Sequence, residues 1–259
     1  MPRVCVINVA GLSGRLLAGG RGERLAALAE GGAKAAVQPV LPAVTCPMQA
    51  TLTTGAPVGV HGVIANGAFD RRLGRVSFWE QSARMVAAPR LWDQMDPAPR
   101  TAMLFWQNSL IAADVILSPK PVHAPDGKTV SWCRDRPAGL YARLAETLGP
   151  FPLHHYWGPM AGLPASEWIT AAALDVWRSE TPDLMLVYLP HLDYDLQRFG
   201  PASPQAADAL AAVDALVGRL LDALGEATVL IVSEYGMTAV AGALHPNRTL
   251  REAGLLAVS

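Results

Sequence analysis

Short apolar runs alternate with helical segments in this sequence, and the alternation limits the folds that the chain can adopt. The β-branched run Val4–Val9 is followed by a helical stretch at Glu23–Glu30, which stops at two glycines. Further on, residues 184–189 and 227–234 are apolar and strand-like, and the alanine-rich stretch 206–224 between them has a helical period. Strands joined by helices need crossover connections. The pattern therefore predicts an α/β fold with a mainly parallel sheet, covered by helices on both faces.

The middle of the sequence, about residues 67–165, is less regular and is rich in proline and tryptophan. It is either a cap inserted over the sheet or an irregular part of the same core. The prediction is one α/β domain over residues 1–259, with a possible cap or insert at about 67–165. Residues 255–258 resemble the start of a strand directly after a helix.

The composition excludes several classes of protein. Of the 259 residues, 51% are hydrophobic and 17% are charged, which excludes a disordered chain. The net charge of -1 leaves no basic surplus for a nucleic-acid polymer. The apolar runs are too short to span a bilayer and the amino terminus lacks a signal-peptide pattern, so a cytoplasmic protein without a membrane span is expected. The three cysteines have no CxxC spacing, so any metal would need oxygen and imidazole ligands.

Polar side chains follow three of the apolar runs, at the edge where open parallel sheets bind their ligands. His191, Asp193 and Asp195 follow one run, Glu234 follows another, and Asn8 lies at the end of the first. If the strand continues, the side chains of the first three residues alternate onto one face. One imidazole and three carboxylates would suit a divalent metal ion. The alternative is a solvated loop whose aspartates make turns.

The segment from residue 42 to residue 55 contains a candidate nucleophile. Thr45 is placed to cap a short helix that has Pro47 in its first turn and ends at Gly55. A hydroxyl there lies at the positive end of the helix dipole, where backbone N–H groups stabilise an anion or a developing alkoxide. Thr45 is therefore either a group that attacks phosphorus or an ordinary helix cap.

The same segment, extended to Asn66, reads TCPMQATLTTGAPVGVHGVIAN and resembles the nucleophile block of the alkaline phosphatase superfamily, in its type I phosphodiesterase/nucleotide pyrophosphatase branch. Thr45 falls on the family's nucleophile, which also bridges two metal ions, and Asn66 on the asparagine that holds a phosphate oxygen. Downstream, HLDYDLQRFGP resembles the DxxxHxYGP metal motif, with Asp193 as its aspartate, and residues 233–237 resemble Ser-Asp-His-Gly-Met. The resemblance covers nearly the whole chain and implies an alkaline phosphatase-like αβα sandwich.

Several of the family's metal-ligand positions hold other residues in this sequence. Ala10 stands where the family has an aspartate before a glycine, and Gln197 replaces the histidine of DxxxH. Glu234 and Tyr235 replace the aspartate and histidine of the later motif. The family's last metal-binding histidine lies further downstream than residue 259, so the chain resembles a domain truncated at its carboxyl end. The inherited two-metal cage is incomplete.

The first hypothesis from the resemblance is a metal-dependent phosphoric ester hydrolase with a rebuilt site. Thr45 and Asn66 would be catalytic, and the metal would be zinc, or manganese in its place. The candidate ligands are Thr45, Asp193, Glu234, His191 and Asp195, with His245 and Asn8 as further possibilities. The phrases LPHLDYDLQRFG and SEYG resemble a bacterial subgroup of phosphodiesterase-like proteins, which favours this hypothesis.

The second hypothesis is a catalytically impaired, metal-free protein that binds a phosphorylated or lipid-like ligand, or a protein partner, through the same pocket and the tryptophan-rich middle of the chain. Its basis is the replacement of family ligands at positions 10, 197 and 235. Asn66, Tyr235 and Gln197 are the expected substrate-binding residues, and the expected partner is a small phosphorylated molecule.

Overall fold

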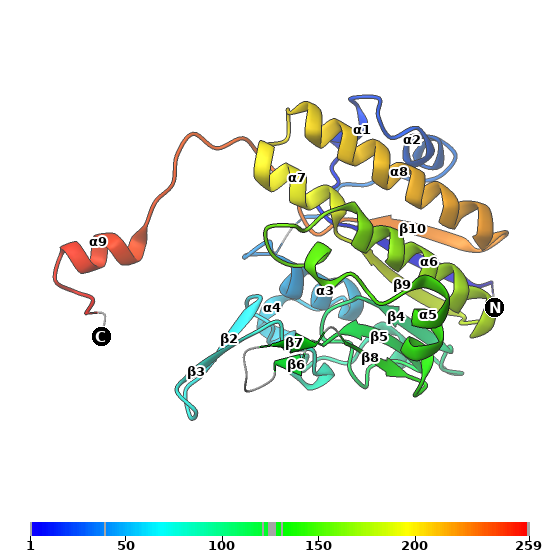
Figure 1. Cartoon of the computed structure of the whole chain (residues 1–259), viewed down its shortest axis with the longest axis horizontal. Coiled ribbons are helices and arrows are strands. Elements are labelled where there is room, and N and C mark those ends of the chain that lie inside the picture. Colours follow the sequence, from blue (N-terminus) through cyan, green and yellow to red (C-terminus); the bar gives the residue numbers. More distant parts are fainter. Residues whose placement is uncertain (1, 39, 121, 124–127, 131, 258–259) are drawn as a thin grey trace.

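A six-stranded sheet forms the centre of the protein (Figure 1). The computed structural model describes residues 2–257 except 39, 121, 124–127 and 131. The strand order is β10-β1-β9-β4-β5-β8; the first five strands are parallel, and β8 is antiparallel to β5. These strands are β1 (Val4–Val9), β4 (Thr101–Leu104), β5 (Val115–Pro119), β8 (Cys133–Arg136), β9 (Leu184–Leu189) and β10 (Thr228–Val232). The predicted α/β fold with a mainly parallel sheet is confirmed.

Helices and two small hairpins surround the sheet. The α-helices are α1 (Gly14–Leu17), α2 (Glu23–Glu30), α3 (Thr45–Thr54), α4 (Val58–His61), α5 (Leu140–Leu148), α6 (Leu163–Ser179), α7 (His191–Phe199), α8 (Pro204–Leu224) and α9 (Pro246–Glu252). Short 3-10 helices are η1 (Ala83–Met85), η2 (Leu91–Gln94) and η3 (Leu153–His155), and the hairpins pair β2 (Gly67–Asp70) with β3 (Arg75–Phe78) and β6 (Val122–His123) with β7 (Thr129–Val130). Within the described ranges, no helix is both long and apolar enough to cross a bilayer.

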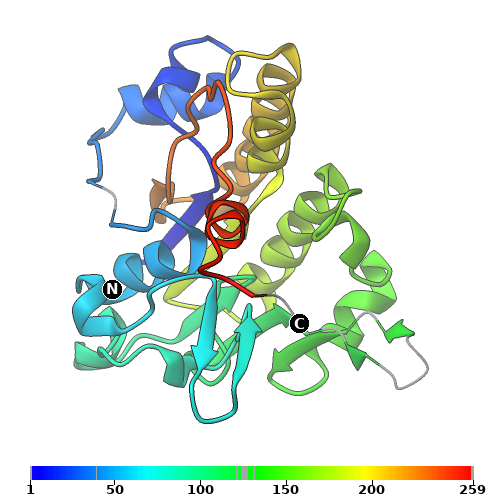
Figure 2. The ribbon, with the colours of Figure 1, turned by 90° about the vertical axis from the view of Figure 1, so that its left-hand side faces the viewer.

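Alternate side chains of the central strands fill two cores on opposite faces of the sheet. Ile7 of β1 and Val187 of β9 belong to the larger core, which packs against α6 and α8. Val6 and Leu186, their neighbours in sequence, point to a smaller core that includes Leu52 of α3. Helices therefore cover both faces, as Figure 2 also shows. Successive side chains of a strand point to opposite faces of the sheet, so strands that are apolar throughout make both faces apolar.

Most of the predicted elements have the expected bounds. Helix α2 and strand β9 match the prediction, and β10 lies within the predicted 227–234. Ser203 followed by Pro204 is the sequence pattern of a helix cap and first turn, and helix α8 begins there: Ser203 Oγ accepts a hydrogen bond from the Ala206 N–H. Residues 255–257 follow a turn and do not form the expected strand, and residue 258 lies outside the described residues.

The irregular middle contributes strands to the central sheet. Strands β4, β5 and β8 all come from residues 67–165, whereas β2–β3 and β6–β7 form separate two-stranded hairpins. The buried strand β4 begins at Thr101, soon after the prolines at 97 and 99. The division of the chain into one domain with a cap or insert stays a prediction.

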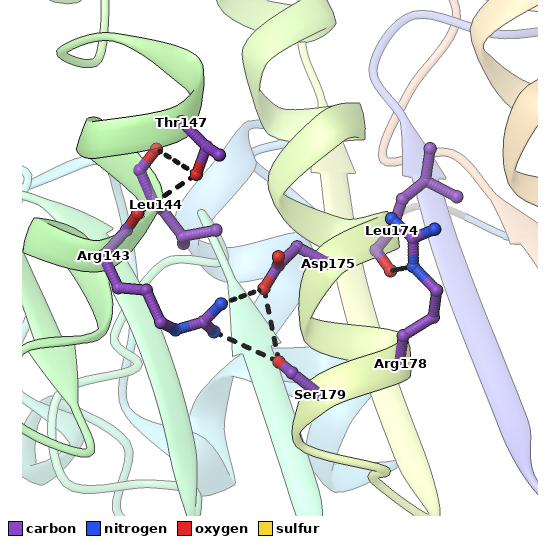
Figure 3. Close-up of polar contacts among 7 residues, drawn as sticks. All are labelled: Arg143, Leu144, Thr147, Leu174, Asp175, Arg178 and Ser179. Atoms are coloured by element: carbon purple, nitrogen blue, oxygen red, sulfur yellow. Dashed lines mark hydrogen bonds and ion pairs between the residues drawn. The ribbon is translucent and has the colours of Figure 1, made fainter.

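A polar network joins α5 to α6 on the protein surface (Figure 3). Arg143 donates to Asp175 Oδ1 at 2.7 Å and to Ser179 Oγ at 3.1 Å, and Ser179 Oγ donates to Asp175 at 3.2 Å. The Arg143 and Asp175 side chains are 43% and 31% exposed, so water weakens the ion pair. Leu144, the next residue of α5, is fully buried in the larger core. Apolar burial should therefore contribute more to holding α5 on the sheet than the ion pair does.

Two substitutions in α5 test this comparison. Leu144→Ala should lower the free energy of unfolding by about 2–5 kcal/mol, because it leaves a cavity in the core. Arg143→Ala should cost about 1 kcal/mol or less, because the pair that it breaks is screened. Urea unfolding followed by circular dichroism measures both values. Equal losses for the two variants would contradict the ranking.

Candidate active site

A cavity of about 650 Å³ opens at the carboxyl ends of the parallel strands. Its wall comes from the segments that follow β9 and β10, the start of α3, and the loops after β4 and η3. The polar and aromatic residues that line it include Thr45, Asn66, Trp79, Gln107, Trp157, Asp193, Gln197, Arg198 and Tyr235. This size and this mixture of groups are typical of a small-molecule site.

Thr45 lies in the first turn of α3, but it does not cap the helix. Val44 has the extended backbone of the N-cap residue, and Thr45 is the first helical residue. Asn66 Oδ1 accepts a hydrogen bond of 2.9 Å from the Cys46 N–H, so a side chain from another loop satisfies this helix end. The cap predicted for Thr45 is therefore wrong. Thr45 lines the cavity instead, at the positive end of the helix dipole.

Strand β9 does not continue through His191, as the sequence suggested; the helix α7 begins there. Pro190 has no backbone N–H for a strand ladder, and Leu192 and Leu196 bury one face at helical spacing. His191, Asp193 and Asp195 consequently do not share one face of a strand. Gly11, after β1, has a φ of 80°, and a Cβ there would lie 2.6 Å from Leu196 Cδ1. A glycine at this turn therefore lets α7 approach the end of β1 closely.

Asp193 is buried beside the cavity and bonded to neutral groups. Its Oδ2 accepts a hydrogen bond from the Gln197 side-chain amide, one helical turn away. The Tyr235 hydroxyl lies close to both Asp193 and Thr45. Burial raises the pKa of Asp193, and hydrogen bonds from Tyr235 and Gln197 offset part of the rise. Asp193 Oδ1 is buried and finds no hydrogen-bond partner among the described residues.

Glu234 is a second buried carboxyl, 1% exposed, close to the Thr45 side chain. Its Oε1 accepts hydrogen bonds from Asn8 Nδ2, at 2.8 Å, and from the Gln49 amide. Gln49 Oε1 in turn accepts the Gln107 N–H at 2.6 Å, which completes the chain of polar groups. Burial raises the pKa of Glu234 to about 7, although the bonds from Gln49, Asn8 and Thr45 favour its ionised form. Its Oε2 has no partner within the described ranges.

Three of the predicted ligands lie away from the cavity. His191 is buried, with its backbone N–H bonded to Ser166 Oγ, and burial lowers the pKa of its imidazole. Asp195 pairs with Arg198 at 3.4 Å, and His245 is an exposed residue at the start of α9. None of the three lines the cavity. Asn8 does belong to the site, but its amide nitrogen donates to Glu234.

The residues present do not fit the two-metal cage of the family pattern. Ala10 is fully buried and supplies no ligand. The Gln197 side-chain amide donates a hydrogen bond to the Asp193 carboxylate and so offers no lone pair from that nitrogen to a metal. No group of three or more His, Cys, Asp or Glu side chains suited to a metal ion occurs in the part of the chain that the structure describes. The two unpartnered carboxylate oxygens, Asp193 Oδ1 and Glu234 Oε2, fit at most one cation bound through oxygen.

Sequence reasoning missed several residues of the cavity wall. Arg198 is the one basic side chain among the lining residues, and it also donates to the Pro159 carbonyl at 3.1 Å. Trp79 and Trp157 line the same cavity from distant loops. The arginine follows Gln197 directly in the HLDYDLQRFGP phrase, so a helical reading of that phrase would have identified it. The tryptophan-rich middle is expected to contact a ligand as a region, but its sequence does not distinguish Trp79 and Trp157 from the other tryptophans.

The chain belongs to the family described as type I phosphodiesterase / nucleotide pyrophosphatase, whose model matches residues 4–259. An uncharacterized pyrophosphatase/phosphodiesterase of Schizosaccharomyces pombe is 23% identical over 213 residues, which cover 77% of this chain and 37% of that protein. The suspected branch of the alkaline phosphatase superfamily is thus confirmed.

Solved structures of two related proteins have the same fold. The phosphonoacetate hydrolase of Sinorhizobium meliloti, in complex with phosphonoacetate, superposes with a TM-score of 0.70 at 20% identity, covering 98% of this chain and 63% of that one. Murine ectonucleotide pyrophosphatase/phosphodiesterase 5 gives a TM-score of 0.62 at 17% identity, covering 92% of this chain and 58% of that one. The chain thus spans less than two thirds of the length of each of these relatives.

Replacement of Glu234 tests whether this buried carboxyl titrates at neutral pH. Its pKa is about 7 in the folded protein and about 4.3 in an unfolded chain. The folded state keeps the proton longer, so the stability from this group is complete below the lower value and is lost as the pH rises through the higher one. In EDTA, the wild type should therefore lose more thermal stability than Glu234→Gln between about pH 5 and about pH 8.

Glutamine suits this test because its Oε1 can still accept the bonds from Asn8 and Gln49. Glu226→Gln, at an exposed position, is the control and should follow the wild-type profile. Melting temperatures across the pH range give the answer. Parallel profiles for the wild type and Glu234→Gln would show that the carboxyl does not titrate there.

Proposed function

We propose that this chain carries the phosphoric ester hydrolase site of its family and that Thr45 is the nucleophile. The observation that carries the proposal is the position of Thr45, which lines the cavity at the N-terminus of α3. Asn66, Asp193 and Tyr235 line the same cavity. A helix N-terminus favours negative charge, so it would stabilise both an alkoxide and a phosphoryl group.

The reaction has two displacements at phosphorus. Thr45 Oγ1 attacks the phosphorus atom, its proton leaves to water, and the bond to the leaving alcohol breaks. Water then cleaves the threonine phosphate ester and restores the hydroxyl. The Tyr235 hydroxyl, which donates its proton to Asp193, lies close to Thr45 and would help to position the Thr45 side chain.

Two side chains are suited to hold the phosphoryl oxygens. Asn66 Oδ1 is occupied by the Cys46 N–H, which leaves its Nδ2 as a donor toward the cavity that it lines. Arg198 of α7, which also lines the cavity, supplies a positive charge. The rings of Trp79 and Trp157 offer apolar surface for the organic part of a small phosphorylated substrate.

Two buried carboxyls beside a phosphate site would repel the substrate when ionised, which supports binding of one divalent cation. Asp193 Oδ1, Glu234 Oε2 and the Thr45 hydroxyl are the groups that would hold it. When bound, the cation would offset the carboxylate charge and ease ionisation of the threonine. An all-oxygen ligand set favours Mn²⁺ or Mg²⁺ over the zinc expected from the family.

Substitution of Thr45 tests the nucleophile. Thr45→Ala should lower the hydrolysis of an aryl phosphodiester, assayed with Mn²⁺, by roughly 1,000-fold or more, while Thr45→Ser should keep measurable activity. Thr170→Ala, a buried helical threonine in α6 that bonds only to its own helix, is the matched control and should keep the wild-type rate. Equal rates for the wild type and Thr45→Ala would exclude Thr45 as the nucleophile.

A second candidate function is metal-free binding of a phosphorylated ligand. The observation that favours it is that the amides of Asn8, Gln49 and Gln197 already donate to the two carboxylates. These neutral donors occupy lone pairs that a metal cage would use. Such a protein would bind an aryl phosphodiester through Asn66 and Arg198 without cleaving it.

Cation binding separates the two candidates. After treatment with EDTA, titration calorimetry with Mn²⁺ should detect one site, and Asp193→Asn should weaken its affinity roughly 10-fold or more. Asp195→Asn removes a carboxyl two residues away that does not line the cavity, so it should leave the affinity unchanged. If the wild type binds no Mn²⁺ but binds the phosphodiester, the metal-free function is the correct one.

A further inference from the structure

The β2–β3 hairpin projects from the body of the protein (Figures 1 and 2). Its strands are antiparallel, with Phe69 opposite Val76. At its base the Trp79 N–H donates to the Asn66 carbonyl at 3.0 Å, and both of these residues line the cavity. The hairpin therefore stands on the rim of the candidate active site.

One face of the hairpin is apolar and exposed. Phe69 and Val76 are cross-strand partners, and Phe78 is two residues further along the same face. Their exposed fractions are 61%, 54% and 69%. Phe78 lies across Gly67, where a Cβ would be 2.7 Å from the ring, so the glycine allows the ring to rest on the opposite strand. Three large side chains thus form a continuous apolar face on a two-stranded ribbon.

The tip of the hairpin is basic. Arg71, Arg72 and Arg75 are all exposed, and Leu73, 63% exposed, lies among them. Asp70, the one acidic residue of the hairpin, accepts the backbone N–H groups of residues 72 and 73 and so holds the turn. In the described part of the chain, the three guanidinium groups make no ion pair. The positive charge is local, because the whole chain has a net charge of -1.

We propose that the β2–β3 hairpin docks on an anionic lipid surface. The apolar face formed by Phe69, Val76 and Phe78 enters the interfacial layer, and the three arginines pair with lipid phosphates. Apolar side chains bordered by basic ones match the layered chemistry of such a surface, where hydrocarbon lies just below negative headgroups. Docking in this way would bring the rim of the cavity, at Asn66 and Trp79, close to the headgroups.

Other occupants of this face match its chemistry less well. A second copy of the chain would bring two arginine-rich tips together, and like charges repel. A nucleic-acid polymer needs a wider basic stripe than three arginines on a chain with no basic surplus. An acidic peptide would satisfy the arginines but would leave the apolar face in water.

The inference does not rest on the proposed hydrolysis. The hairpin residues named here are outside the set that lines the cavity, so lipid docking and turnover of a soluble substrate can be measured separately.

Vesicle flotation tests the proposal with the full chain. The wild type should float with vesicles of equal parts phosphatidylcholine and phosphatidylglycerol, should remain unbound with pure phosphatidylcholine, and should be released by salt. Each arginine should contribute about fivefold to the partition coefficient, so Arg71→Gln/Arg72→Gln/Arg75→Gln should lower it roughly 100-fold. Phe69→Ser/Phe78→Ser should also lower it, without loss of salt sensitivity.

Matched controls come from equally exposed positions elsewhere. Arg15→Gln/Arg84→Gln/Arg219→Gln removes the same charge, and Val37→Ser/Leu41→Ser removes apolar side chains that are 59% and 85% exposed. Both controls should bind like the wild type. All variants should keep the wild-type melting temperature and the wild-type rate on a soluble aryl phosphodiester.

Four outcomes would overturn the proposal. Two of them concern the vesicles: equal binding to neutral and anionic vesicles, and equal losses of binding in the hairpin and control variants. The third is the formation of hairpin-dependent dimers in sedimentation without vesicle binding. The fourth is binding to polyglutamate or to an oligonucleotide that is as tight as binding to the anionic vesicles. A wild type that binds anionic vesicles but hydrolyses no phosphodiester would contradict the proposed hydrolase while leaving the lipid docking intact.

Discussion

The parallel pairing of β1 with β9 on one side and β10 on the other is the constraint on which the site depends. Asn8 lies opposite Tyr188 of β9 and Val232 of β10, so the carboxyl ends of the three strands meet at one edge. Because of that register, Asn8 reaches Glu234 across 226 positions of sequence. Helix α7 can then close over the end of β1, since Gly11 leaves room for it. Without this pairing, the segments that line the cavity would have no common edge.

The buried Glu234 shows how this site stabilises a carboxyl that is removed from water. A carboxyl taken out of water resists ionisation, and the protein compensates with amide donors rather than with the histidines and aspartates of the family pattern. Neutral donors hold a carboxylate in place without the charge of a metal, but they satisfy only one of its oxygens. The carboxylate oxygens without a partner, Asp193 Oδ1 and Glu234 Oε2, keep the site polar. They would hold a cation in a metal-assisted hydrolase and would stay without one in a metal-free phosphate-binding pocket.

Aromatic and basic groups surround this polar centre at two levels, the cavity wall and the hairpin outside it. Trp79, Trp157 and Arg198 form the wall of the cavity, and the β2–β3 hairpin carries a second combination of aromatic rings and arginines outside it. The Trp79–Asn66 hydrogen bond ties the two levels together at the base of the hairpin. Each level therefore offers apolar surface next to positive charge.

The sequence alone determined the fold class and the family, because strand and helix periods are local and the motif around Thr45 is contiguous. It also identified Asn66, Asp193, Gln197 and Tyr235, which the fold brings to one cavity. Only the tertiary structure decided the rest. The residues His191–Phe199 alternate polar and apolar at their start, yet burial of Leu192 and Leu196 makes them a helix and turns His191 and Asp195 away. Asn66 rather than Thr45 caps α3, since capping depends on a loop 20 residues away. Long-range packing, which no local pattern encodes, selects those partners.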